Sequence, residues 1–133
     1  MTIRTTTGAA ALLMAVATGG CVTYPADPVQ DSAPARSFVG LGQPVSLGGG
    51  YVATPRKVYE DSRCHVGVQC VWAGRVVVTT QIDGPGWSET LNLVSGKPLR
   101  THGHEFLLIE VLPAQHPQED ISESDYRFNF VMD

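Results

Sequence analysis

The chain has 133 residues, a formal net charge of −4 at pH 7 and a hydrophobic content of 43%, which suits a single globular domain. It has no cluster of basic residues, so it lacks the electrostatic footprint of a nucleic-acid-binding protein. The 14 glycines and 9 prolines fall between short apolar runs, a rhythm typical of an all-β protein.

The first 20 residues have the parts of a bacterial export signal. Arg4 supplies a positive charge, residues 8–18 form an apolar run, and two glycines precede Cys21. A membrane-spanning helix needs about 20 apolar residues, and this run is too short. We therefore predict that residues 1–20 are a signal peptide, removed from the mature protein.

The sequence TGGC, at residues 18–21, resembles the lipobox of bacterial lipoproteins, although Thr18 stands where leucine is usual. The resemblance implies that Cys21 receives a diacylglycerol and becomes the first residue of a protein anchored in a lipid bilayer. Val22, in place of the aspartate that retains such proteins at the inner membrane, favours an outer membrane, with the protein facing the periplasm. The alternative is an ordinary secretory signal, which would leave Cys21 as a free thiol.

Residues 21–36 are rich in Pro, Ala, Asp and Ser and have no apolar period, as expected of a flexible tether. The domain should then span residues 37–133. Alternating apolar residues indicate extended segments at 38–50, 51–61, 70–83, 88–94, 104–113 and 125–133. They predict about six or seven strands, no helix, and a small antiparallel β-sandwich or barrel.

Three of these segments indicate which side chains face the core. The segment 104–113 is apolar on both faces, as expected of a central strand. In the segments 70–83 and 125–133, only one face should be buried. The residues expected on the buried face of 70–83 are Trp72, Val76, Val78, Thr80 and Ile82. Those expected on the buried face of 125–133 are Tyr126, Phe128, Phe130 and Met132.

If Cys21 carries lipid, Cys64 and Cys70 are the remaining thiols in an oxidising compartment and should form a disulfide. A zinc site is the rival interpretation, but such sites usually have two residues between cysteines, and here there are five. Residues 65–69 would form a hairpin loop between strands. The loop is either a stabilising staple or a rigid recognition loop, whose candidate residues are Arg63, His65, Val66, Gly67, Val68, Gln69 and Trp72.

The sequence DSRCHVGVQCVWAG, at residues 61–74, resembles the DSRCP…V.CVWAG signature of a group of small exported bacterial proteins, many of them predicted lipoproteins. The resemblance extends over most of residues 40–132, through LGQPVSL, FLLIEVLP and DYRFNFVM. It implies a fold and a location, and it implies no activity. His65 departs from the signature, which has proline there.

Four residues of this segment have competing interpretations. Trp72 should pack over the disulfide or the core, or else be exposed for a partner. Asp61 and Arg63 should form a bracing ion pair rather than a catalytic one. Gly74 should permit close packing or a bulge.

No serine lies in a nucleophile motif, and the sequence predicts neither catalysis nor a cofactor. It predicts a non-catalytic, lipid-anchored cell-envelope protein. One alternative is a binding module, or an inhibitor of a secreted enzyme, that meets an envelope protein through the 65–69 loop. Another is a periplasmic metal-binding protein in which His102 and His104 share one strand face, with His65 or His116 as a third ligand. A polar loop at 102–104 is the simpler interpretation.

Overall fold

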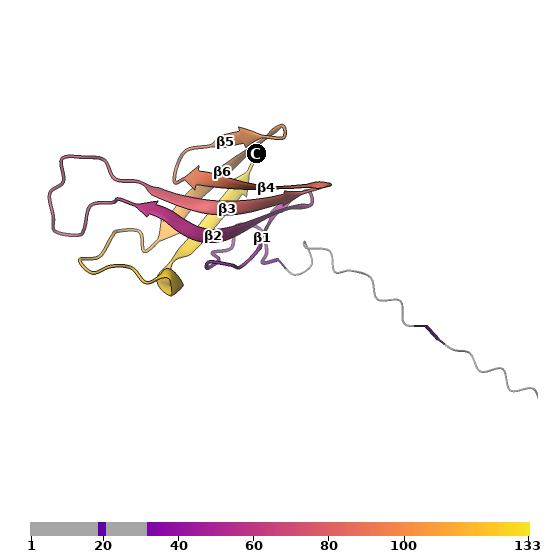
Figure 1. Ribbon diagram of the computed structural model, residues 1–133, viewed down its shortest axis with the longest axis horizontal. Helices are drawn as coiled ribbons and strands as arrows, with labels where there is room; N and C mark the ends of the chain where they lie inside the picture. Colours follow the sequence, from indigo (N-terminus) through magenta and orange to yellow (C-terminus); the bar gives the residue numbers. More distant parts are fainter. Residues whose placement is uncertain (1–18, 21–31) are drawn as a thin grey trace, which may run out of the picture.

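The computed structural model describes residues 19–20 and 32–133. The predicted signal peptide, the lipidation site at Cys21 and most of the predicted tether lie outside the described residues. Within them the chain forms seven strands in two antiparallel sheets, consistent with the predicted small β-sandwich (Figure 1). None of the helices in the described part is long and apolar enough to cross a membrane.

The first sheet has the strand order β1-β2-β3-β4 and the second β5-β6-β7. The strands are β1 (Val45–Gly48), β2 (Tyr51–Asp61), β3 (Val76–Gly84), β4 (Trp87–Val94), β5 (Leu99–Thr101), β6 (His104–Leu112) and β7 (Arg127–Met132). A 3-10 turn, η1 (Glu123–Asp125), precedes β7. The prediction that residues 104–113 form a central strand is confirmed, because β6 lies between β5 and β7.

The core lies between the two sheets and follows the predicted alternation. Side chains that are two apart along a strand share a face, so β3 contributes Val76, Val78 and Ile82 to the core. From the second sheet, Phe106, Leu108, Phe128 and Phe130 meet them and are nearly fully buried. The expectation that Trp72 faces the core is wrong, because it lies before β3 and is 60% exposed. Of the two interpretations of this residue, exposure is the one observed.

The segment that precedes β1 closes one side of the sandwich. Val39 forms a bridge with Phe128 of β7, with backbone hydrogen bonds of 3.0 and 2.8 Å. Ala33, expected within the tether, forms a parallel bridge with Val45 of β1. The chain therefore makes contacts with the domain from Ala33 onward.

The boundaries of the β2–β3 connection differ from those predicted. β2 ends at Asp61 and β3 begins at Val76, so the connection comprises residues 62–75 instead of 65–69, and neither cysteine lies on a strand. The alternating pattern of residues 70–75 has no core to face, because this loop projects beyond both sheets (Figure 1). The β6–β7 connection, residues 113–126, lies at the same end of the sandwich.

Candidate functional site

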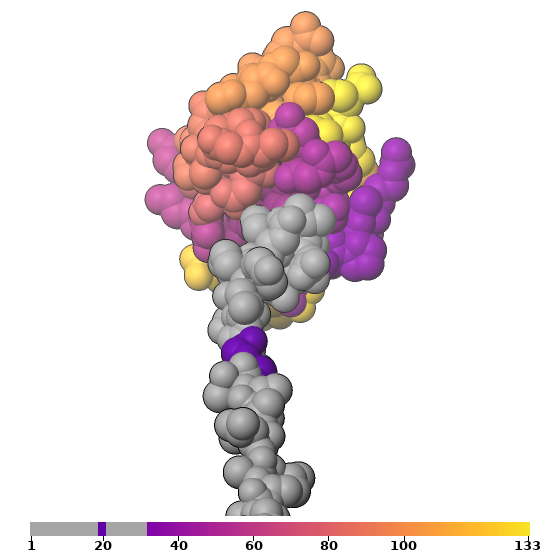
Figure 2. All heavy atoms as spheres, turned by 90° about the vertical axis from the view of Figure 1, so that its right-hand side faces the viewer, coloured from indigo at the N-terminus to yellow at the C-terminus, as the bar shows by residue number. Residues whose placement is uncertain are grey.

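The candidate site consists of these two loops at one end of the sandwich. We call residues 62–75 the displayed loop and residues 113–126 the acidic loop. The opposite end, seen in Figure 2, carries the turns between β3 and β4 and between β5 and β6.

The displayed loop is closed twice. At its tip, Cys64 and Cys70 form the predicted disulfide, with their Cα atoms 5.9 Å apart. At its base, the Ser62 amide donates to the Arg75 carbonyl at 2.9 Å, and the Arg75 amide donates to the Ser62 hydroxyl at 3.1 Å. Gly74 lies so close to Ser62 that an added Cβ would stand 2.3 Å from the Ser62 carbonyl oxygen. The glycine thus permits the close packing that the sequence predicts.

Four apolar side chains of the displayed loop face solvent. Val71 is 98% exposed and Trp72 is 60% exposed, while Val66 and Val68 are about half exposed. The indole nitrogen of Trp72 donates to the Ser62 carbonyl at 3.2 Å, so the ring is oriented without being buried. We call Val66, Val68, Val71 and Trp72 the apolar tip.

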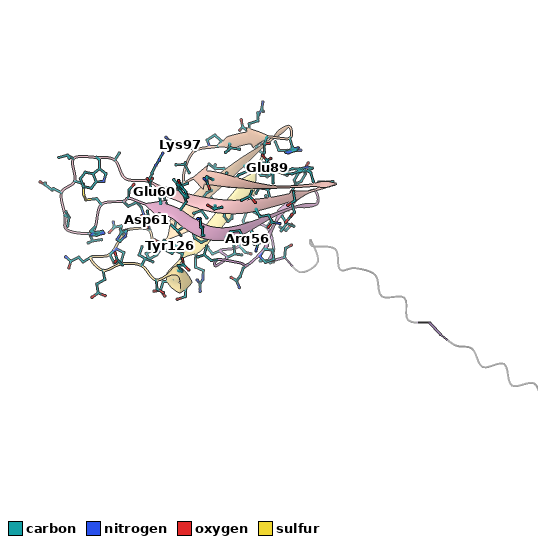
Figure 3. The ribbon with its side chains drawn as sticks, in the orientation of Figure 1. Arg56, Glu60, Asp61, Glu89, Lys97 and Tyr126 are labelled. Carbon is teal, nitrogen blue, oxygen red and sulfur yellow. A yellow bond between two sulfur atoms is a disulfide. The ribbon has the colours of Figure 1, made fainter. Side chains whose placement is uncertain are left out.

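Asp61 and Arg63 form a brace that joins the two loops. Nε and Nη2 of Arg63 each donate to the Asp61 carboxylate at 2.9 Å, and Nη1 donates to the Pro113 carbonyl at 2.7 Å. The Tyr126 hydroxyl donates to Oδ2 of Asp61 at 2.7 Å. Figure 3 shows Asp61 and Tyr126 side by side where β2 ends and β7 approaches. The ion pair is therefore a brace, as the sequence predicts, and Arg63 is engaged in it.

The brace is partly removed from water, with the side chains of Asp61 and Arg63 only 7% and 17% exposed. Burial alone would raise the pKa of Asp61. The hydrogen bonds from Arg63 and Tyr126 and the charge of Arg63 outweigh it, so that pKa lies below its usual range. The hydrogen bond to Asp61 raises the pKa of Arg63. Burial, followed by the hydrogen bond to Asp61, raises the pKa of Tyr126 well above its usual value.

A second contact between the loops pairs two histidines. The rings of His65 and His116 lie 4.2 Å apart between centroids, and the Val66 amide donates to the His116 carbonyl at 2.8 Å. His116 is buried, and its Nδ1 donates to the Pro117 carbonyl at 2.8 Å. The sequence predicts His65 as a loop residue and either histidine as a candidate third metal ligand, but no local pattern in it indicates that they meet.

His102 and His104 do not share a strand face, so that part of the metal hypothesis is wrong. Thr101 and His104 are paired across β5 and β6, which leaves His102 in a two-residue turn at a φ of 49°. The ring of His102 stacks on Trp87 at 3.8 Å, whereas His104 packs against Tyr51 at 4.8 Å. Among the described residues, no group of three or more His, Cys, Asp or Glu side chains is arranged to hold a metal ion.

An open groove of about 570 Å³ lies along the acidic loop and reaches the apolar tip at Val66. It is lined by Val66, Pro113, Pro117, Gln118, Glu119, Asp120, Ile121 and Asp125. The groove therefore combines an apolar lining with three carboxylates.

The fold and the site together define a small β-sandwich domain whose displayed loop is stapled by a disulfide. Comparison with protein-family models, curated proteins and solved structures found no match to the chain.

Proposed function

We propose that this protein is a non-catalytic binding module of the bacterial cell envelope, which recognises another exported protein through the apolar tip of the displayed loop. The observation that carries the proposal is the exposure of Val71 and Trp72 at 98% and 60%. Burial of apolar surface stabilises association by about 25 cal/mol per Å², and exposed apolar clusters commonly mark interaction sites. Tryptophan in particular is enriched among the residues that dominate binding energy.

The bracing of the displayed loop supports a recognition role. The disulfide, the contact of Arg63 with Pro113 and the pairing of His65 with His116 restrain the loop at separate points. A loop that is ordered before binding loses less conformational entropy on meeting a partner. If the partner is a secreted enzyme, the same rigidity would suit the loop to act as an inhibitor.

The proposal requires neither a cofactor nor catalysis. Within the described part of the chain, the ionisable groups with clearly perturbed pKa values, Asp61, Arg63 and Tyr126, are bonded to one another. This brace explains their perturbation without a reaction, because structural ion-pair networks also shift pKa values.

We further propose that Cys21 is lipidated and anchors the domain to a bilayer, with the protein on the outer membrane facing the periplasm. The lipobox resemblance and Val22 support this placement. The described chain enters the domain beside β1, which pairs with the early part of β2 at Ala53, whereas the displayed loop follows the end of β2. Figure 1 shows the loop at the far side from this entry.

The experiment is capture of the envelope partner by the exported full chain carrying a carboxyl-terminal tag, with crosslinking in intact cells. The loop variant combines Val71→Asp and Trp72→Ala. The matched control is Tyr59→Ala, which removes a similarly exposed aromatic ring, 61% exposed, from β2. We expect the loop variant to lose a partner that wild type and control both capture. Equal capture by all three proteins would overturn the proposal.

A further inference from the structure

We infer that the groove beside the displayed loop receives an extended segment of the partner protein, in which a lysine or arginine side chain neighbours an apolar one. This inference rests on the proposed function and specifies the chemistry of the partner. Two features of the groove carry it: its continuity with the apolar tip, and the unpaired carboxylates along it.

The groove and the apolar tip form one surface. Val66 belongs to both, and its amide is hydrogen-bonded to the His116 carbonyl of the acidic loop. Pro113, Pro117 and Ile121 supply further apolar lining. A volume of about 570 Å³ falls within the range of pockets that bind small ligands or side chains, roughly 300–1,000 Å³. A segment that covers the apolar tip can therefore continue into the groove.

The charge of the groove is negative and locally uncompensated. Glu119, Asp120 and Asp125 line it, and none of the three is in an ion pair with another described residue. The acidic loop, residues 113–126, contains no lysine or arginine.

The two neighbouring arginines are engaged elsewhere. Arg63 is paired with Asp61. Arg127 donates to the carbonyls of Ser124 and Tyr126 at 2.8 and 2.7 Å. Carboxylates beside an apolar lining are complementary to a cationic side chain whose neighbour is apolar.

Charge argues against the other two possible occupants. Residues 22–31 of this chain contain two aspartates and no lysine or arginine, so this part of the predicted tether would be repelled by the groove. A second copy has a net charge of −4 and presents the same acidic surface. A segment of a different protein is the occupant that the charge favours.

The test measures binding of labelled peptides to the exported full-length protein by fluorescence anisotropy. The probe is a peptide of the repeat Arg-Leu-Gly. Two matched peptides replace arginine by glutamate or leucine by serine. The groove variant combines Glu119→Gln, Asp120→Asn and Asp125→Asn. Its control makes the same charge change at the other end of the strands, with Asp83→Asn, Glu105→Gln and Asp133→Asn.

We expect saturable binding of the Arg-Leu-Gly peptide that is about tenfold weaker in the groove variant and unchanged in the control. The affinity should fall as NaCl rises from about 0.05 to about 0.5 M, because salt screens exposed charges. Both matched peptides should bind more weakly. No saturable binding, equal binding of the glutamate peptide, or equal loss in both charge variants would overturn the inference. The inference would also be overturned if sedimentation showed that the protein self-associates through the groove, because a second copy would then be its occupant.

Failure of this inference is distinguishable from failure of the proposed function. If only the groove inference fails, the Arg-Leu-Gly peptide does not bind, yet the Val71→Asp, Trp72→Ala variant still loses the envelope partner. If the proposed function fails, that variant keeps its partner whatever the peptide does.

Discussion

The Tyr126 hydroxyl donates a 2.7 Å hydrogen bond to Oδ2 of Asp61, a residue 65 positions earlier in the chain. Asp61 is the last residue of β2, and Tyr126 directly precedes β7. The bond therefore links the two sheets at the point where both loops leave them. Because Arg63 donates to both oxygens of the same carboxylate and also to the Pro113 carbonyl, this brace sets the position of the displayed loop relative to the acidic loop.

The first prediction concerns the energetics of the brace. Tyr126→Phe should lower the free energy of unfolding by about 2 kcal/mol, as for loss of a hydrogen bond to a charged group. Asp61→Ala should cost about 3 kcal/mol, because it leaves the Arg63 charge partly buried and unpaired. Urea denaturation of both single variants and the double variant measures these values. The double variant should lose less than the sum of the two, and strict additivity would contradict a shared network.

The second prediction is a pH dependence of stability. The pKa of Asp61 is lower in the folded protein than its ordinary value, so the unfolded state binds the proton more tightly. The stabilisation is therefore present above about pH 4 and is lost as pH falls through the folded pKa. We expect Asp61→Asn to be less stable at neutral pH and to lose less stability between about pH 4 and pH 2 than wild type. Parallel acid profiles for the two proteins in chemical denaturation would contradict the assigned role.

The third prediction concerns the disulfide. Replacing Cys64 and Cys70 together by serine should lower stability by about 2 kcal/mol, the chain-entropy estimate for a loop of this length. For a domain of this size the melting temperature should fall by roughly 8–16 °C. Thermal unfolding followed by circular dichroism tests this, and the β spectrum should persist below the transition. Free thiols at both positions in the exported protein, detected by alkylation, would refute the bond.

The fourth prediction concerns the anchor. If Cys21 is acylated, Cys21→Ser should release the protein into the soluble fraction, because the hydrophobic attachment is removed. Mass spectrometry of the amino terminus of the native protein identifies the modification. An unmodified terminus that begins at any other residue would exclude the lipoprotein proposal.

The sheets were predictable from sequence because their signal is local. A strand with one buried face alternates with a period of two, and this pattern correctly identified β2 and the buried faces of β3 and β7. The same pattern failed at residues 70–75. There Val71 and Trp72 continue the apolar run, but the loop projects beyond both sheets and no core covers it.

The site was less predictable because its contacts join residues that are distant in sequence. Arg63 meets Pro113 50 positions later, and His65 meets His116 across the same two loops. Only the packing of the two sheets brings these loops to one end. The failure at His102 has a local cause: the His102–Gly103 turn reverses the chain, with φ angles of 49° and 79°, so the two histidines lie on different elements.

The central claim is that the apolar tip contacts a partner protein in the envelope. A photo-activatable side chain placed at position 71 of the exported full chain tests it in intact cells, with position 59 on β2 as the matched exposed control. We predict that irradiation yields a discrete crosslinked partner from position 71 and none from position 59. No crosslinked protein from position 71, or the same products from both positions, would contradict the claim.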